Sequence, residues 1–204
     1  MSDIQFKIEN GVMKPVLPVK KSVGDFKIND ANQLFKYVGK ETGNLVIPSN
    51  VRLFRAGVFT NCVFNSVEIP EGVIALNTSL FEDCKLLETV KLPSTIRVLG
   101  QRAFYNCKAL KDIVLPEGLE FIGDDCFYNC ESLERIIIPG SVRVIPNTCF
   151  ARCKNLKEIV LSEGVQVILN GAFMEVDFNA IKFPSTITDI AMISLKKFYE
   201  DTKG

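Results

Sequence analysis

The sequence predicts a repeat solenoid, built mostly from short β-strands that are joined by brief helical or 3-10 turns. The first observation is a column of phenylalanines that recurs at a step of 22 and then 23 residues. Self-similarity at a fixed period of about 20 to 50 residues is typical of stacked-repeat proteins. The members of this column are Phe59, Phe81, Phe104, Phe127, Phe150 and Phe173.

Two further columns keep the same register. The prolines are Pro48, Pro70, Pro93, Pro116, Pro139 and Pro184, with Ser162 in the missing place. The cysteines are Cys62, Cys84, Cys107, Cys130 and Cys153, and Val176 takes the sixth place. A unit of this length cannot bury a core alone, so neighbouring units must stack and share one. We therefore expect about six to seven coils over residues 46–190.

Each coil is expected to contain a strand, a turn at the proline, a second short strand and a compact turn. The second strand is illustrated by residues 119–122, and residues 124–130 suit a single helical or 3-10 turn with Asp124 as a capping residue. Apolar columns should face the interior. They are Leu86, Leu110, Leu133 and Leu156; Val90, Ile113, Ile136 and Ile159; and Leu76, Leu99, Ile122, Ile145, Ile168 and Ile190.

The two ends of the stack need covers, because an open end exposes core residues and strand edges. Residues 1–45 are the expected N-terminal cap, with a hairpin around Asn10-Gly11 and a short helix from Asp30 to Val38. Residues 191–204 are the expected C-terminal cap, since the apolar spacing there is helical. The N-terminal segment is longer than capping requires, so it is also a candidate for homo-oligomer formation or partner binding.

The repeat resembles a known family. The run Ala103-Phe104-Tyr105-Asn106-Cys107, continued by Leu110, Ile113 and Leu115-Pro116, is similar to the unit of the BspA-like leucine-rich repeats, which have 23 residues per repeat. The resemblance covers about residues 45–190. It implies a leucine-rich-repeat right-handed solenoid with a parallel sheet, and a protein-binding role without a specified partner.

Composition narrows the function. Lys+Arg and Asp+Glu both number 24, so the net charge is zero, which argues against nucleic-acid and anionic-membrane surfaces. The chain has no histidine, which removes Ser-His-Asp and Cys-His catalysis. No stretch is apolar enough to span a membrane, and the first residues do not resemble a secretory signal. We therefore expect a non-enzymatic cytoplasmic protein without a cofactor, whose cysteines are thiols.

Four cysteines at C-x3-C-x18-C-x3-C spacing raise the alternative of a zinc site. They are Cys126, Cys130, Cys149 and Cys153. Tetrathiolate sites use such paired spacings. The repeat explains them without a metal, because Cys130 and Cys153 belong to the cysteine column. Cys126 and Cys149 fill a slot for a small buried residue, and buried thiols behave as small hydrophobes. In the other coils this slot holds Val58, Leu80, Ala103 and Ala172.

Outward-facing apolar columns are the candidate protein-binding residues. One column is Val114, Ile137 and Val160, bounded by the charged residues Lys91 and Lys182; it alternates with inward residues along each strand. The other is Leu53, Val98, Phe121, Val144 and Val167 on the second strand. The alternative is that β-branched residues stand there because they form strands well. Tyr105 and Tyr128, beside the phenylalanine column, are secondary candidates.

Charges also repeat, with signs that alternate between coils. One column is Glu88, Lys111, Glu134 and Lys157, and its neighbour is Asp112, Arg135 and Glu158. Opposite charges on neighbouring strands stabilise a sheet, so mutual neutralisation is the expected role.

The leading functional hypothesis is an intracellular bacterial or phage module that binds another protein as an inhibitor, effector or scaffold. The rigid stack would present side chains at fixed spacing, which limits the ordering entropy lost on binding. A BspA-type surface adhesin is the first alternative. A structural subunit that associates through its ends or its N-terminal segment is the second.

Overall fold

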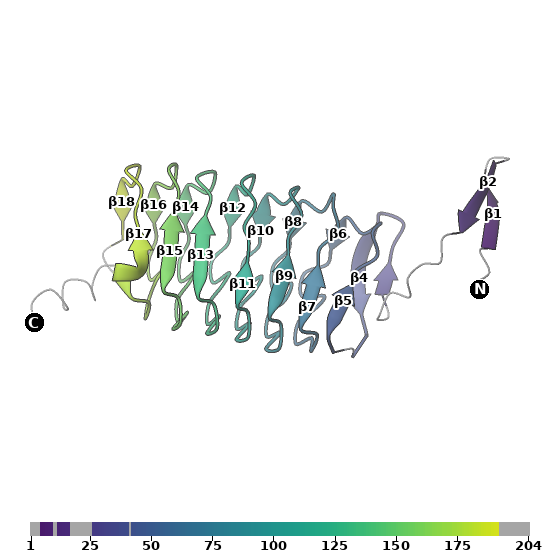
Figure 1. The fold of residues 1–204 in the computed structure, drawn as a ribbon, viewed down its shortest axis with the longest axis horizontal. Coiled ribbons are helices and arrows are strands. Elements are labelled where there is room, and N and C mark those ends of the chain that lie inside the picture. The colour runs from purple at the N-terminus through teal and green to yellow at the C-terminus, as the bar shows by residue number, and fades with distance from the viewer. Residues whose placement is uncertain (1–4, 10–11, 17–25, 41, 192–204) are drawn as a thin grey trace, which may run out of the picture.

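The computed structural model describes residues 5–9, 12–16, 26–40 and 42–191, and it shows a parallel β-solenoid of about seven turns (Figure 1). Each complete coil contributes one strand to each of two outer surfaces, which we call face A and face B. The face A strands are β5 (Asn44–Val46), β7 (Ser66–Glu68), β9 (Thr89–Lys91), β11 (Asp112–Ile113), β13 (Arg135–Ile138), β15 (Glu158–Leu161) and β17 (Ile181–Lys182). The face B strands are β6 (Leu53–Phe54), β8 (Ala75–Leu76), β10 (Val98–Leu99), β12 (Phe121–Ile122), β14 (Val144–Ile145), β16 (Val167–Ile168) and β18 (Asp189–Ile190).

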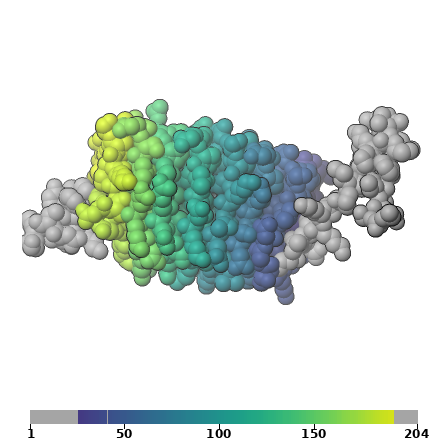
Figure 2. Space-filling model, in the orientation of Figure 1, coloured from purple at the N-terminus to yellow at the C-terminus, as the bar shows by residue number. Residues whose placement is uncertain are grey.

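Both faces are interrupted at the same level of the stack. On face A the strand orders are β5-β7-β9-β11 and β13-β15-β17, and on face B they are β8-β10-β12 and β14-β16-β18. Strand β6 is paired with neither of the two face B groups. The turns between the strands remain joined across this level, because the Phe127 N–H donates to the Cys149 carbonyl at 2.9 Å. The stack is therefore continuous in its turn layer and divided in its sheets (Figure 2 shows the coils in their sequence order).

The phenylalanine column forms the centre of the core. All six side chains are buried, and successive rings are nearly parallel with centroids 5.2 to 5.5 Å apart. Before the first coil, the Tyr37 ring covers the end of this stack edge-on, with its centroid 5.3 Å from that of Phe59. The repeated ring thus supplies the buried apolar area that a single coil lacks.

The inward columns follow the prediction with one correction. Leu86 is 48% exposed, whereas Leu87 is fully buried and occupies the column one step of 23 residues before Leu110. The sequence has two adjacent leucines at this point, and only the second keeps the register of the coil. At the other end of the stack Ile190 is half-buried.

The compact turns are not helical. Residues 124–130 form successive turns in which Asp125 and Asn129 have left-handed backbone, with φ of 57° and 59°. A helical turn needs right-handed dihedrals throughout. Equivalent left-handed residues recur in the other coils at Ser79, Asp83, Arg102, Asn106, Thr148, Arg152 and Glu175. Within the described ranges the one 3-10 helix is Phe178–Ala180.

The helix expected from Asp30 to Val38 is wrong. Residues Gln33–Tyr37 form strand β4, which pairs antiparallel with β3 (Phe26–Ile28) and parallel with β6. The Asn29 side chain accepts from the N–H groups of Ala31 and Gln33, which closes a turn rather than starting a helix. Leu34 is fully buried opposite Phe54, so pairing with the first coil overrides local helix propensity.

The remaining expected cap elements are described in part. Strands β1 (Gln5–Glu9) and β2 (Val12–Val16) pair antiparallel, with Glu9 opposite Val12, as the predicted hairpin requires. Its turn residues 10 and 11 lie outside the described residues. The expected C-terminal helix falls on residues 191–204, of which only Ala191 is described.

Candidate protein-binding surface

Face A carries the first predicted apolar column. Pairing of the strands aligns Val46, Glu68 and Lys91, and it aligns Ile137, Val160 and Lys182 on the other side of the interruption. Val114 stands between the two groups and is 75% exposed, while Ile137 is 40% exposed and Val160 is half-buried. The structure therefore places these three residues in one outward column, as predicted.

The two lysines that bound this column are engaged in ion pairs. The Lys91 ammonium lies 2.5 Å from Glu68, and the Lys182 ammonium lies 2.9 Å from Glu158. The hydrogen bond that Lys91 donates to Glu68 raises the pKa of Lys91, and the one that Lys182 donates to Glu158 lowers the pKa of Glu158. Both lysines are thus neutralised locally and do not form a basic patch.

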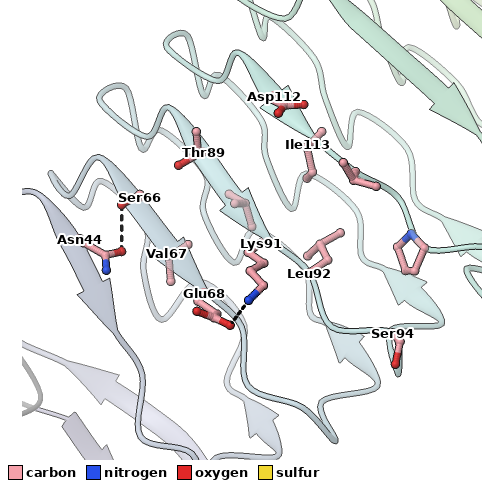
Figure 3. Close-up of a pocket in the computed structure, with 13 residues that line it drawn as sticks. Asn44, Ser66, Val67, Glu68, Thr89, Lys91, Leu92, Ser94, Asp112 and Ile113 are labelled. Atoms are coloured by element: carbon pink, nitrogen blue, oxygen red, sulfur yellow. Dashed lines mark hydrogen bonds and ion pairs between the residues drawn. The ribbon is translucent and has the colours of Figure 1, made fainter. Parts of the chain in front are cut away.

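A groove of about 660 Å³ runs across face A over strands β5, β7, β9 and β11 (Figure 3). Its lining includes a polar column, of which the sequence pattern indicated only Asp112. The members of this column are Asn44, Ser66, Thr89 and Asp112. The Ser66 hydroxyl lies 2.9 Å from the Asn44 side-chain oxygen, and the Lys91–Glu68 pair lies along the same groove (Figure 3). Asp112 and Val114 mark its end towards the interruption. A groove between coils depends on tertiary spacing, and no single repeat position reveals it.

A smaller cleft of about 150 Å³ opens where the sheet is interrupted. Residues from both sides line it, including Val114 and Leu115 from the β11 coil and Arg135 and Ile137 from β13. Val114 lines the groove as well as the cleft, so the two are continuous. The most exposed of the large apolar side chains in the described structure thus stands where the two hollows meet.

Face B carries the second predicted column. Phe121 is 56% exposed and Val144 is 40% exposed, while Val98 and Val167 are half-buried. Strand pairing aligns Val98 with Phe121 and Val144 with Val167. Face B therefore carries a second exposed apolar column, on different strands from those that line the groove.

The two tyrosines lie in the turn layer and contact each other. The Tyr105 and Tyr128 rings are stacked at 4.9 Å, and the guanidinium groups of Arg102 and Arg152 lie 5.2 and 5.7 Å from their centroids. Both tyrosines are half-buried. Because the ring faces are already covered, this pair has a packing role and offers only its edges to a partner.

The cysteines are core residues. Six of the seven thiols are buried, and Cys62 is partly exposed. Burial raises the pKa of the Cys126, Cys130 and Cys149 thiols and raises that of Cys153 to about 12, so these groups are neutral in the folded chain at neutral pH. Metal binding requires thiolates. In the residues described, no three His, Cys, Asp or Glu side chains cluster as metal ligands would.

The predicted charge columns form ion pairs between neighbouring coils. Lys111 lies 2.9 Å from Glu88, and Arg135 lies 2.9 Å from Glu158. A similar pair in the turn layer joins Lys108 to Glu131 at 2.7 Å. Asp112, Glu134 and Lys157 depart from this pattern, because no ion pair to any of the three exists among the residues that the structure describes.

Comparisons with known proteins agree with this geometry. The family model of the BspA type leucine-rich repeat region matches in six copies, over residues 31–99 and 78–200. The crystal structure of a leucine-rich repeat protein from T. pallidum is 25% identical with a TM-score of 0.64, over 86% of this chain and 81% of that one. None of the curated proteins matches the chain significantly.

Two larger proteins share the fold. A leucine-rich cell surface protein from Faecalibacterium prausnitzii is 25% identical with a TM-score of 0.72, over 93% of this chain and 51% of that one. A leucine-rich repeat protein from Bacteroides ovatus is 23% identical with a TM-score of 0.67, over 93% and 54%. The chain spans about half the length of both. None of its described helices is long and apolar enough to cross a membrane. The chain belongs to the BspA-type leucine-rich repeat family.

Proposed function

We propose that the chain is a non-enzymatic protein-interaction module and that its partner binds face A. The observation that carries this proposal is the exposed column of Val114, Ile137 and Val160, which stands beside the groove. Soluble proteins seldom expose contiguous apolar side chains without a use for them. The stacked phenylalanine core holds these side chains on a rigid frame, so binding loses little ordering entropy.

Face A is favoured over face B because it combines an apolar column with a groove and hydrogen-bonding groups. Ser66, Thr89 and Asp112 line the groove within reach of a bound chain. Protein interfaces typically combine an apolar centre with a polar rim. Face B remains the comparison surface, since Phe121 and Val144 are also exposed.

The cellular setting is the finer part of the proposal. The leading candidate is an intracellular module that acts as an inhibitor, effector or scaffold, and the buried, reduced thiols support it. A surface adhesin is the second candidate, supported by the F. prausnitzii relative, which is described as a cell surface protein. Fractionation of the producing cells, followed by detection of the chain, separates the two.

Site-specific photo-crosslinking tests the face. A benzophenone amino acid replaces Val114 on face A or Phe121 on face B, and the full chain is irradiated in extract or on intact cells. We expect the probe at position 114, but not the one at 121, to join the chain to one protein, identified by mass spectrometry. Crosslinks from position 121 alone would move the site to face B. If neither probe forms a crosslink, neither sheet face is the binding site.

A further inference from the structure

Two carboxylates beside Val114 are left without ion-pair partners in the described part of the chain. Asp112 precedes Val114 by two residues, Glu117 follows it by three, and both are exposed and line the 150 Å³ cleft. The cations that line the groove and the cleft are engaged with other groups. Lys91 is paired with Glu68 and Arg135 with Glu158. The apolar centre of face A therefore lies in a locally negative surface.

The interruption of the sheet gives this centre its shape. Strand β11 has two residues and β13 has four, and the strand order stops between them. The resulting cleft of about 150 Å³ is smaller than the roughly 300 to 1,000 Å³ of small-molecule pockets. It suits one inserted side chain, and the segment that carries this side chain lies parallel to β11, at the end of the 660 Å³ groove that Asp112 and Val114 line.

We propose that this surface takes an extended peptide segment of a partner protein in which a basic side chain stands two residues from a large apolar one. The inference rests on the proposed function, because it names the chemistry of the partner that face A binds. The apolar side chain enters the cleft against Val114 and Ile137. The ammonium or guanidinium group lies against Asp112 and Glu117, which form no ion pair within the described structure, while Arg135 in the same cleft is paired with Glu158.

The spacing of the two features matches such a segment. Asp112 and Val114 stand two residues apart on one side of the chain, about 6.5 to 7 Å along a strand. The same distance separates residues i and i+2 of an extended peptide, whose side chains also point the same way. An apolar and a basic residue at this spacing therefore reach the cleft and the carboxylate together. A partner segment with an acidic residue there would meet like charge, which costs several kcal/mol at an interface.

Peptide selection tests this chemistry without knowledge of the natural partner. A random seven-residue library displayed on phage is selected on the purified full chain at low ionic strength. We expect enrichment of Lys or Arg two positions from Leu, Ile, Phe or Met. A synthetic peptide of the selected pattern should bind about two- to fivefold more weakly to D112N and more than about tenfold more weakly to D112K. D189N, on exposed strand β18 of face B, is the matched control and should bind unchanged.

Enrichment of acidic peptides, or of no pattern, would overturn the inference, as would equal affinity of D112K and D189N for the selected peptide. This failure is separable from failure of the proposed function. If the probe at position 114 crosslinks to a partner whose contacting segment contains no basic residue, the inference fails while binding at face A stands. If that probe captures nothing, the proposed function fails as well.

Discussion

The Cys130 thiol donates a hydrogen bond of 3.3 Å to the backbone carbonyl of Phe104, which stands 26 residues earlier in the preceding coil. The same contact joins Cys84 to Phe59, Cys107 to Phe81 and Cys153 to Phe127, at 3.0 to 3.1 Å. The two most regular columns of the sequence are therefore partners in one repeated contact. Cysteine suits this slot because it is small and apolar and still carries a donor.

The thiol contact predicts that replacing a cysteine of the hydrogen-bonded column lowers the free energy of unfolding more than replacing Cys126 or Cys149. Cys130→Ala removes a buried sulfur and its hydrogen bond, and it should lower the free energy of unfolding by about 1 to 3 kcal/mol. The double change Cys126→Ala and Cys149→Ala should leave the fold intact, because Ala103 and Ala172 already fill that slot. Urea unfolding followed by circular dichroism measures both. One zinc per chain in the purified protein, lost with the fold in the double variant, would contradict the structural role.

The phenylalanine stack predicts a dependence on position. Phe127 is stacked between Phe104 and Phe150, whereas Phe173 has a stacked ring on one side in the described structure. Phe127→Ala should therefore cost about 3 to 5 kcal/mol, and Phe173→Ala should cost less. The denaturant midpoints of the two variants measure these two losses of stability. Equal losses would indicate that the coils do not share a continuous core.

The repeat could be predicted from the sequence because identical side chains recur wherever identical surroundings recur. The strands β3 and β4 that precede the first coil could not, since they do not contain the phenylalanine and cysteine columns. Residues 30–38 combine Asp30 with helix-like apolar spacing, yet Leu34 is buried as part of a strand because β6 offers it a pairing edge. The turn at residues 124–130 is likewise not the helical turn that the capping residue Asp124 indicates. Left-handed residues such as Asn129 have no apolar signature, and only their tolerance of positive φ marks them.

The candidate site could also be predicted only in part, because some of its features depend on tertiary structure that the repeat does not encode. Strand alternation was enough to identify Val114, Ile137 and Val160 as outward residues. The groove, the cleft and the unpaired Asp112 depend on where the sheet is interrupted, and this level of the stack has no distinct mark in the repeat. The charge column suggested that Asp112 would be neutralised by Arg135, but strand pairing sets Arg135 opposite Glu158 instead.

The buried thiols predict loss of stability at high pH. Burial raises the pKa of Cys153 to about 12 in the folded chain, while an unfolded cysteine titrates near pH 8.5. Between these values the unfolded chain loses the proton and the folded chain keeps it. Stability from this thiol is therefore fully present below about pH 8.5 and falls as pH rises, by about 2 kcal/mol at pH 10.

Cys153→Val isolates this effect, because valine fills the same slot at Val176. Urea unfolding at pH 7.5 and at pH 10 should show a smaller alkaline loss in the variant than in the parent chain. Lysine and tyrosine titrations are common to both proteins and cancel in the comparison. An identical pH dependence of the two would show that the Cys153 thiol does not titrate differently in the folded chain.

The apolar column predicts a change that affects binding but not folding. Ile137 lies between Val114 and Val160, so Ile137→Glu places a charge at the centre of the proposed interface, where a partner must desolvate it. Binding should fall at least about tenfold, because an unpaired buried charge costs several kcal/mol. The free chain should tolerate the change, since Ile137 is 40% exposed and Glu68 occupies the equivalent place three coils away. Val144→Glu, equally exposed on face B, is the matched control. Thermal melts establish folding, and retention of the crosslinked partner measures binding. Loss with Val144→Glu alone would assign the site to face B, and unchanged binding in both variants would point to the N-terminal 45 residues.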